Sequence, residues 1–171
     1  MKNLNEILKE RIVILDGGMG TMIQNHSLAE LDYKGDLFSN HPVSLKGNHD
    51  VLSLTCPGII KDIHTAYLEA GADIIETNTF SSNKISQSDY KMEDSVKELN
   101  FASVKLARQA ADEITLKDPE KPRFVCGILG PTNRTASLSP DVNDPGFRNI
   151  TYDELFSSYY EQAESLFDGE V

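Results

Sequence analysis

The 171-residue sequence predicts an α/β fold in which three strands of a parallel sheet alternate with three helices. Three apolar runs, beginning near Ile12, Asp73 and Phe124, have the length and composition of buried strands. Segments with helical spacing or helix-capping residues follow these runs along the chain. Alternating strands and helices require right-handed crossover connections, and these connections make neighbouring strands parallel.

The first unit opens with a short helical segment at residues 4–10 and a strand at residues 12–15. Because the apolar run of this strand is unbroken, we expect it to be buried on both faces. The polar stretch at residues 24–50, in which Gly47-Asn48 is a turn signal, is predicted to be a loop.

The helix of the first unit is expected at residues 57–70. Pro57 suits the first turn of a helix, and Gly71 suits its C-terminal cap. Apolar residues recur at helical spacing and are predicted to form the buried face: Ile60, Ile63, Ala66 or Tyr67, and Ala70.

The second and third units follow the same plan. A strand at residues 73–77 precedes a helix at residues 93–116, and a strand at residues 124–129 precedes a polar loop. Thr151-Tyr152-Asp153-Glu154 has the capping-box pattern, which predicts a helix that runs to about Phe167. Because Asp168-Gly169 has the pattern of another helix end, we expect residues 1–171 to be a partial domain, truncated before its fourth strand.

Composition and charge narrow the class of protein. The net charge of −11 argues against nucleic acid and against an anionic membrane surface as partners, since both require clustered Lys and Arg. No apolar stretch reaches the length of a membrane span, and Glu6 and Lys9 interrupt the N-terminal segment where a signal peptide would be apolar. Two cysteines make no disulfide framework, so we expect a cytoplasmic protein.

Three long stretches carry a resemblance to a known family: ILDGGMGTMIQ, LKGNHDVLSLTCPGIIKDIHTAYLEAGADIIETNTF and LGPTNRTASLSPDVNDPGFRNITYDEL. Over nearly its whole length the chain resembles the N-terminal homocysteine-binding domain of cobalamin-dependent methionine synthases. The DGG and ETNTF pieces are similar to the wider homocysteine methyltransferase group, whereas the loop at residues 132–145 resembles the cobalamin-dependent branch. The resemblance implies the N-terminal part, about three βα units, of a homocysteine-binding (β/α)8 TIM barrel.

Candidate site residues stand where the predicted strands end, which is where barrels place their functional groups. An acid such as Asp16 can accept hydrogen bonds from an ammonium group, and Gly17 and Gly18 let backbone N–H groups approach a carboxylate. By their pattern alone, these residues also fit an acid and two glycines in a tight turn. A dinucleotide-binding motif is disfavoured because Ile23 stands where it needs a further glycine. Together with the resemblance, the pattern assigns a substrate-binding set: Asp16, Gly17, Gly18, Glu76, Asn78, Gly130 and Asn133.

The resemblance also implies a reaction, namely transfer of a methyl group from methylcobalamin, recharged by 5-methyltetrahydrofolate, to the sulfur of homocysteine. The zinc ligands of the family are three cysteines that include a Gly-Gly-Cys-Cys segment, and this sequence contains no Cys-Cys pair. Neither Cys56 nor Cys126 matches a ligand position, and the four histidines, including His64, are expected in loops or on helix surfaces. Zinc and cobalamin are therefore expected in the full-length parent, and no metal or cofactor in this fragment, which we expect to be inactive alone.

Homocysteine and the cobalamin and folate domains of the parent enzyme are the expected partners. Two alternatives stay open. In the first, the chain is a non-catalytic remnant of a disrupted gene; in the second, it is part of a homocysteine methyltransferase that uses betaine or S-methylmethionine, in place of methylcobalamin, as the methyl donor.

Overall fold

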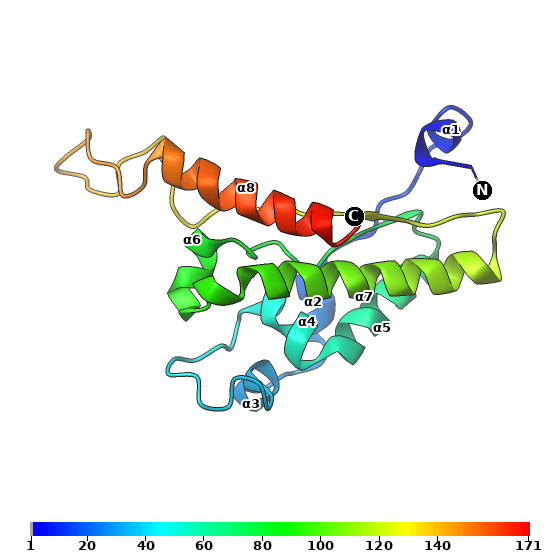
Figure 1. Ribbon diagram of the computed structural model, residues 1–171, viewed down its shortest axis with the longest axis horizontal. Coiled ribbons are helices and arrows are strands. Elements are labelled where there is room, and N and C mark those ends of the chain that lie inside the picture. Colours follow the sequence, from blue (N-terminus) through cyan, green and yellow to red (C-terminus); the bar gives the residue numbers. More distant parts are fainter. Residues whose placement is uncertain (1) are drawn as a thin grey trace.

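The computed structural model describes residues 2–171, and Figure 1 shows that it consists mainly of helices. The sheet consists of β1 (Ile74–Glu76) and β2 (Phe124–Cys126), which run parallel with Ile75 opposite Val125. Leu15 adds a single parallel bridge to Ile74. The apolar runs thus pair in parallel, as the predicted α/β fold requires.

The predicted first strand, at residues 12–15, is reduced to this bridge. Its backbone is still tied to β1, because the Ile14 carbonyl accepts the N–H groups of Asp73 and Ile74. The expectation that the strand is buried on both faces is wrong, since the side chain of Ile12 is 87% exposed and that of Ile14 is 58% exposed. Within residues 2–171 this segment has one neighbouring strand, so its apolar residues lack the contacts that their pattern predicts.

The predicted helix at residues 57–70 is confirmed as α5 (Pro57–Ala70), which ends at Gly71 with a left-handed φ of 114°. Its buried face differs from the prediction. Ala66 and Ala70 are exposed, whereas His64 and Leu68 are buried. The reason is that α5 packs against a helix later in the chain along the ridge of every fourth residue from Ile60.

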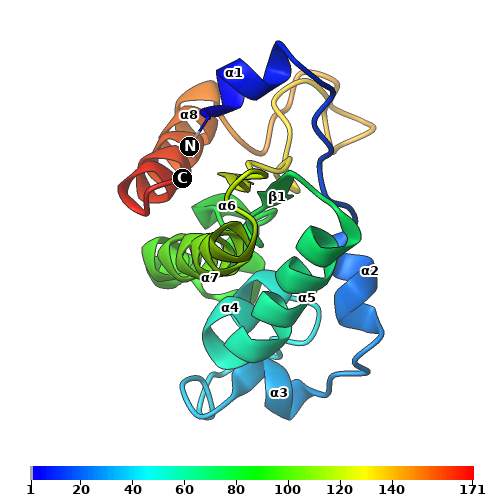
Figure 2. The ribbon, with the colours of Figure 1, turned by 90° about the vertical axis from the view of Figure 1, so that its right-hand side faces the viewer.

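The other two predicted helices are also confirmed. They are α7 (Val96–Lys117), preceded by the 3-10 turn η3 (Glu93–Ser95), and α8 (Tyr152–Asp168). The capping box of α8 is formed as expected, because the Thr151 hydroxyl accepts the Glu154 N–H and the Glu154 carboxylate accepts the Thr151 N–H. Figure 2 shows α5, α7 and α8 side by side around β1, with α7 in the middle.

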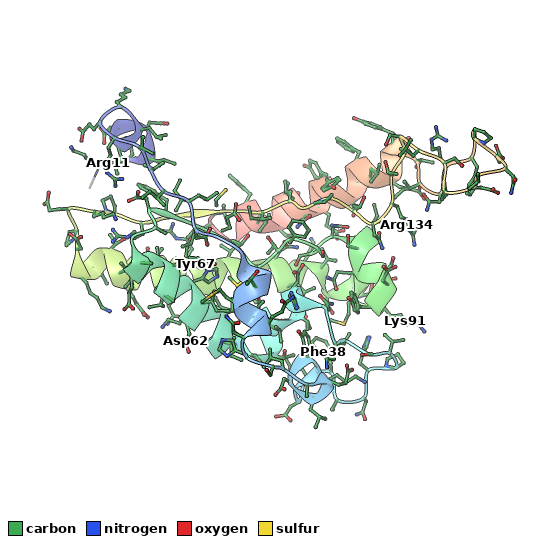
Figure 3. All side chains as sticks on the ribbon, turned by 180° about the vertical axis from the view of Figure 1, so that it is seen from behind. Arg11, Phe38, Asp62, Tyr67, Lys91 and Arg134 are labelled. Atoms are coloured by element: carbon green, nitrogen blue, oxygen red, sulfur yellow. The ribbon has the colours of Figure 1, made fainter. Side chains whose placement is uncertain are left out.

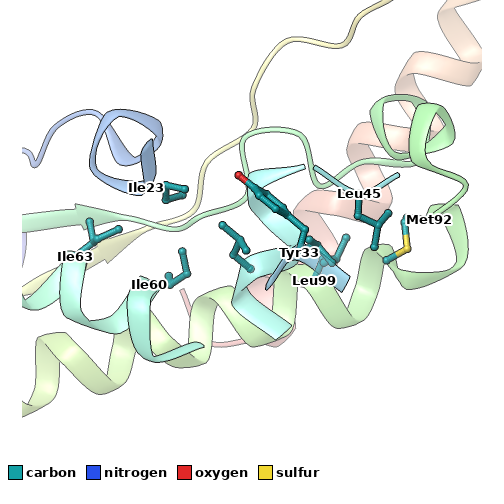
Figure 4. Close-up of a cluster of buried hydrophobic side chains, with 9 residues drawn as sticks. Ile23, Tyr33, Leu45, Ile60, Ile63, Met92 and Leu99 are labelled. Carbon is teal, nitrogen blue, oxygen red and sulfur yellow. The ribbon is translucent and has the colours of Figure 1, made fainter. Parts of the chain in front are cut away.

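Most of the segment at residues 24–50 is a loop, as predicted, but one short helix lies inside it and other short helices flank it. After α1 (Leu4–Leu8) come α2 (Met19–Gln24), α3 (Glu30–Lys34), the 3-10 turn η1 (His49–Val51) and α4 (Leu52–Thr55). The remaining elements are α6 (Lys84–Gln87) and the 3-10 turn η2 (Ser88–Tyr90). These helices are too short to show a periodic apolar pattern, and tertiary contacts hold them. Figure 4 shows the core cluster in which Ile23 of α2, Tyr33 of α3 and Leu45 join Ile60, Ile63, Met92 and Leu99.

A second cluster of buried residues fixes the sheet on the helices. Ala107, Ala110 and Ala111 of α7 are fully buried against Ile75 of β1 and Leu68 of α5. Because alanine side chains are small, they let α7 lie close to the sheet, which sets the position of the carboxyl ends of the strands.

Candidate functional site

The carboxyl ends of the parallel strands enclose a cavity of about 470 Å³. Asp16 follows the Leu15 bridge, and Glu76 is the last residue of β1, so both carboxylates lie at the same edge of the sheet. Five of the seven predicted site residues line this cavity: Asp16, Gly17, Gly18, Glu76 and Asn78. The structure therefore brings together side chains that lie about sixty residues apart in the sequence.

Asp16 has one engaged and one free carboxylate oxygen. Oδ2 accepts the backbone N–H of Glu76 at 3.1 Å, which fixes the side chain across the gap between the two strands. Oδ1 is buried and contacts no hydrogen-bond donor within residues 2–171. Burial, and to a lesser degree the negative charge of Glu76, raises the pKa of Asp16 to about 6. A buried acceptor without a partner is the kind of group that a ligand donor satisfies.

The glycine segment after Asp16 exposes backbone rather than side chains. In the part of the chain that is described, no acceptor contacts the N–H of Gly17 or Gly18. Figure 3 shows Tyr67 of α5 beside the start of α2, and its hydroxyl donates to the Gly18 carbonyl at 3.4 Å. A Cβ at Gly17 would lie 3.2 Å from that hydroxyl oxygen, so glycine allows the close approach of Tyr67. Two unpaired N–H groups next to a carboxylate are complementary to an amino acid zwitterion.

Asn78 is almost fully buried, and its side chain is held by the framework. Its Nδ2 donates to the His49 carbonyl at 2.9 Å and to the Ser53 hydroxyl at 3.2 Å. The Ser103 hydroxyl of α7 donates to the backbone carbonyl of Asn78 at 3.0 Å and is hydrogen-bonded to that same Ser53 hydroxyl at 2.7 Å. This buried network ties the end of β1 to η1, α4 and α7, so the cavity wall is rigidly supported.

Gly130 and Asn133 lie outside the residues that line the cavity. A Cβ at Gly130 would collide with the carbonyl oxygen of Phe80, which does line the cavity, so this glycine supports the wall from behind. Asn133 is exposed in the loop between β2 and α8, where it donates to the Asp89 carboxylate of η2 at 2.5 Å. The structure gives both residues contacts with the framework rather than with the cavity.

Asp50 and His49 also line the cavity, and the sequence analysis missed both because it treated residues 24–50 as a loop. Asp50 is 4% exposed, and His49 is half-buried and stacks on Tyr33 with ring centroids 6.2 Å apart. Burial raises the pKa of Asp50 to about 6 and lowers the pKa of His49. The feature of the sequence that could have indicated these two site residues is the polar stretch Gly47-Asn48-His49-Asp50 directly before the apolar Val51-Leu52.

The residues of this chain do not fit a zinc ion. No group of three or more His, Cys, Asp or Glu side chains within residues 2–171 is arranged to hold a metal. Cys56 donates to the Asp32 carbonyl at the start of α5, and Cys126 is exposed at the end of β2. The expectation that His64 lies on a helix surface is wrong, because its side chain is fully buried in α5 and cannot reach the cavity as a ligand.

None of the helices found in residues 2–171 combines the length and the apolar character needed to span a membrane. Three acids, Asp16, Asp50 and Glu76, line the cavity, and no Lys or Arg of the described residues does so. At pH 7 the charge of this lining is therefore complementary to a positive group.

Comparisons with known proteins show the family and the fold of this chain. The family model described as homocysteine S-methyltransferase matches residues 13–171. Among solved structures, the metallated form of the homocysteine methyltransferase MmuM from Escherichia coli superimposes with a TM-score of 0.70 at 22% identity, over 98% of this chain and 54% of that one. The oxidized form of MmuM gives a TM-score of 0.69 at 21% identity, over 99% of this chain and 55% of that one. The chain spans about half the length of these structures, and at this identity the likeness shows a shared fold.

Proposed function

Because the chain belongs to the homocysteine S-methyltransferase family, we propose that its cavity binds the amino acid part of homocysteine in an enzyme that methylates the homocysteine sulfur. The observation that carries this proposal is that a carboxylate oxygen without a partner, Asp16 Oδ1, lies next to two backbone N–H groups without a partner, those of Gly17 and Gly18. The carboxylate suits the ammonium group of the substrate, and the N–H groups suit its α-carboxylate.

In this proposal the residues of the chain bind and orient the substrate. Asp16 and Glu76 receive the ammonium group, and the network behind Asn78 keeps the wall in place while the ligand is bound. Methyl transfer then forms a bond from the substrate sulfur to the methyl carbon and breaks the bond from that carbon to the donor, and the thiol proton has to leave before or during attack. No residue among those that line the cavity is assigned to this chemistry.

We assign zinc and cobalamin, which the resemblance to cobalamin-dependent methionine synthases implies, to parts of a longer parent enzyme. Residues 2–171 provide no set of metal ligands, and a corrin macrocycle is larger than the cavity of about 470 Å³. On this proposal, residues 1–171 are part of a homocysteine-binding barrel. They meet cobalamin and folate domains in a cytoplasmic enzyme, and they are inactive alone.

A second candidate keeps the substrate and changes the donor. The cavity is lined by three acids, Asp16, Asp50 and Glu76, and by no Lys or Arg among the described residues. This charge favours small methyl donors whose methyl group sits on a cationic centre, such as the ammonium group of betaine or the sulfonium group of S-methylmethionine, over anionic ones. Assays of the full-length protein with methylcobalamin, betaine and S-methylmethionine as the only donor separate the two candidates, since each predicts methionine formation from its own donor alone.

Homocysteine binding is tested with the 171-residue chain by isothermal titration calorimetry and by thermal unfolding. Homocysteine at one hundred times its Kd should stabilise the chain by about 2.7 kcal/mol. Asp16→Asn keeps an acceptor for the Glu76 N–H but removes the charge, so we expect about a tenfold or greater loss of affinity. Asp62→Asn, at an exposed position on α5 (Figure 3), removes the same charge away from the cavity and should bind like the unmodified chain. Equal affinity of the Asp16→Asn and Asp62→Asn variants would contradict the proposal.

A further inference from the structure

We propose that Asp50 is a further specificity-determining residue of this site, whose free carboxylate oxygen selects ligands that carry an ammonium group. The inference rests on the proposed function, because it adds a second recognition group to the same cavity. Its basis is the geometry of Asp50, which nothing in the motifs at residues 16–18 or 76–78 indicates.

The two oxygens of Asp50 have different surroundings. Oδ2 accepts both the backbone N–H of Ser81 at 2.7 Å and the hydroxyl of Ser82 at 2.9 Å, so it holds the turn that follows β1. No donor in residues 2–171 contacts Oδ1, and this atom is not among the fully buried polar atoms that lack a partner, so it keeps some exposed surface. Since Asp50 is 4% exposed and lines the cavity, its Oδ1 faces the cavity.

A structural role alone does not explain a carboxylate at this position. An asparagine would accept the same hydrogen bonds from Ser81 and Ser82 without the free-energy cost of burying a charge. Within the described part of the chain, no Lys or Arg forms an ion pair with Asp50. A buried carboxylate without a counter-ion destabilises the free protein, and a bound cation offsets that cost.

The titratable groups around Asp50 do not supply this cation. Asp16 and Glu76 line the same cavity and are acids, and the nearby Tyr90 adds no positive charge. His49 is the one basic side chain on the wall within the described residues, and burial lowers its pKa, which disfavours its charged form. The positive group therefore has to come from the ligand, and the ammonium group of an amino acid fits this requirement.

The test compares two ligands that differ only in the ammonium group, L-homocysteine and 4-mercaptobutanoate, by calorimetry under reducing conditions. For Asp50→Asn we expect about a tenfold loss of affinity for homocysteine, while the affinity for 4-mercaptobutanoate stays the same or rises. Asp62→Asn is the matched control and should keep the ligand preference of the unmodified chain. Circular dichroism checks that each variant is folded.

The outcomes separate this inference from the proposed function. If Asp50→Asn lowers the affinity for both ligands equally, or keeps the preference for homocysteine, then Asp50 only holds the turn. In that case the inference fails, while the proposal of homocysteine binding stands. If the unmodified chain binds homocysteine no better than 4-mercaptobutanoate, the proposed function fails, and the role of Asp50 fails with it.

A measurement on the unmodified chain covers the case in which Asp50→Asn does not fold. Carbon-13 NMR follows the titration of the Asp50 carboxyl group with and without ligand. A bound ammonium group should lower the pKa of Asp50 by about one unit or more, since an opposite charge favours the ionised form. 4-Mercaptobutanoate should not lower this pKa. Equal titration curves with both ligands would overturn the inference.

Discussion

The replacement His64→Leu should stabilise the protein, and more so at low pH. His64 lies in α5 with a side chain that is fully buried, and neither ring nitrogen has a hydrogen-bond partner in residues 2–171. Burial lowers the pKa of His64 from its ordinary value of 6.5 to about 4. A leucine of similar size fills the space without two unsatisfied polar atoms, whose burial is unfavourable.

The size of the effect follows from the two pKa values. The pKa of His64 is lower in the folded state than in the unfolded state. The unmodified protein therefore keeps its full stability above pH 6.5 and loses stability as the pH falls towards 4. At pH 5 the imidazole is protonated in the unfolded chain and neutral in the folded one, which costs the unmodified protein about 2 kcal/mol relative to pH 8. The leucine variant is free of this loss, so its advantage should grow by about 2 kcal/mol from pH 8 to pH 5.

Urea unfolding of the unmodified protein and of His64→Leu at pH 8 and pH 5 measures how much the stability advantage of the variant changes with pH. The comparison cancels the opposite contributions of Asp16 and Asp50, whose raised pKa values stabilise the folded state as the pH falls. His26→Leu is the control, since it makes the same replacement at an exposed position. An equal advantage of His64→Leu at both pH values would refute the reasoning, because it would mean that the buried ring takes up its proton as readily as in the unfolded chain.

Two further replacements test the framework of the site. Gly130→Ala should destabilise the chain by about 2 kcal/mol or more in urea unfolding, because its Cβ would meet the backbone of Phe80 and the wall cannot move aside cheaply. Unchanged stability would show that the loop adapts. Asp73→Asn should cost about 2 kcal/mol at pH 7, because the hydrogen-bonded Arg11 lowers the pKa of Asp73 to about 2, and the loss should fade as the pH approaches 2. A destabilisation by Asp73→Asn that is equally large at pH 2 would rule out this electrostatic origin.

Part of the candidate site was predictable from the sequence. Asp16 and Glu76 come directly after apolar runs, and parallel strands bring such positions to one edge of the sheet, so both carboxylates were expected to lie together. Asp50 was not predicted, because it precedes a helix of four residues, α4, that shows no periodic pattern. Its place in the cavity depends on hydrogen bonds to Ser81 and Ser82, about thirty residues later in the chain. Gly130 was predicted at a strand end, but its contact with Phe80 places it behind the cavity wall.

The sequence by itself determined the local features of this protein. The start of α5 at Pro57, its end at Gly71 and the capping box at Thr151 depend on residues within a few positions of one another, so their patterns predict them directly. Only the tertiary structure decided which apolar and polar residues are covered. Ile12 is exposed and His64 is buried, against the expectation from their own segments, because burial depends on the neighbouring elements that pack against a segment and not on its own sequence.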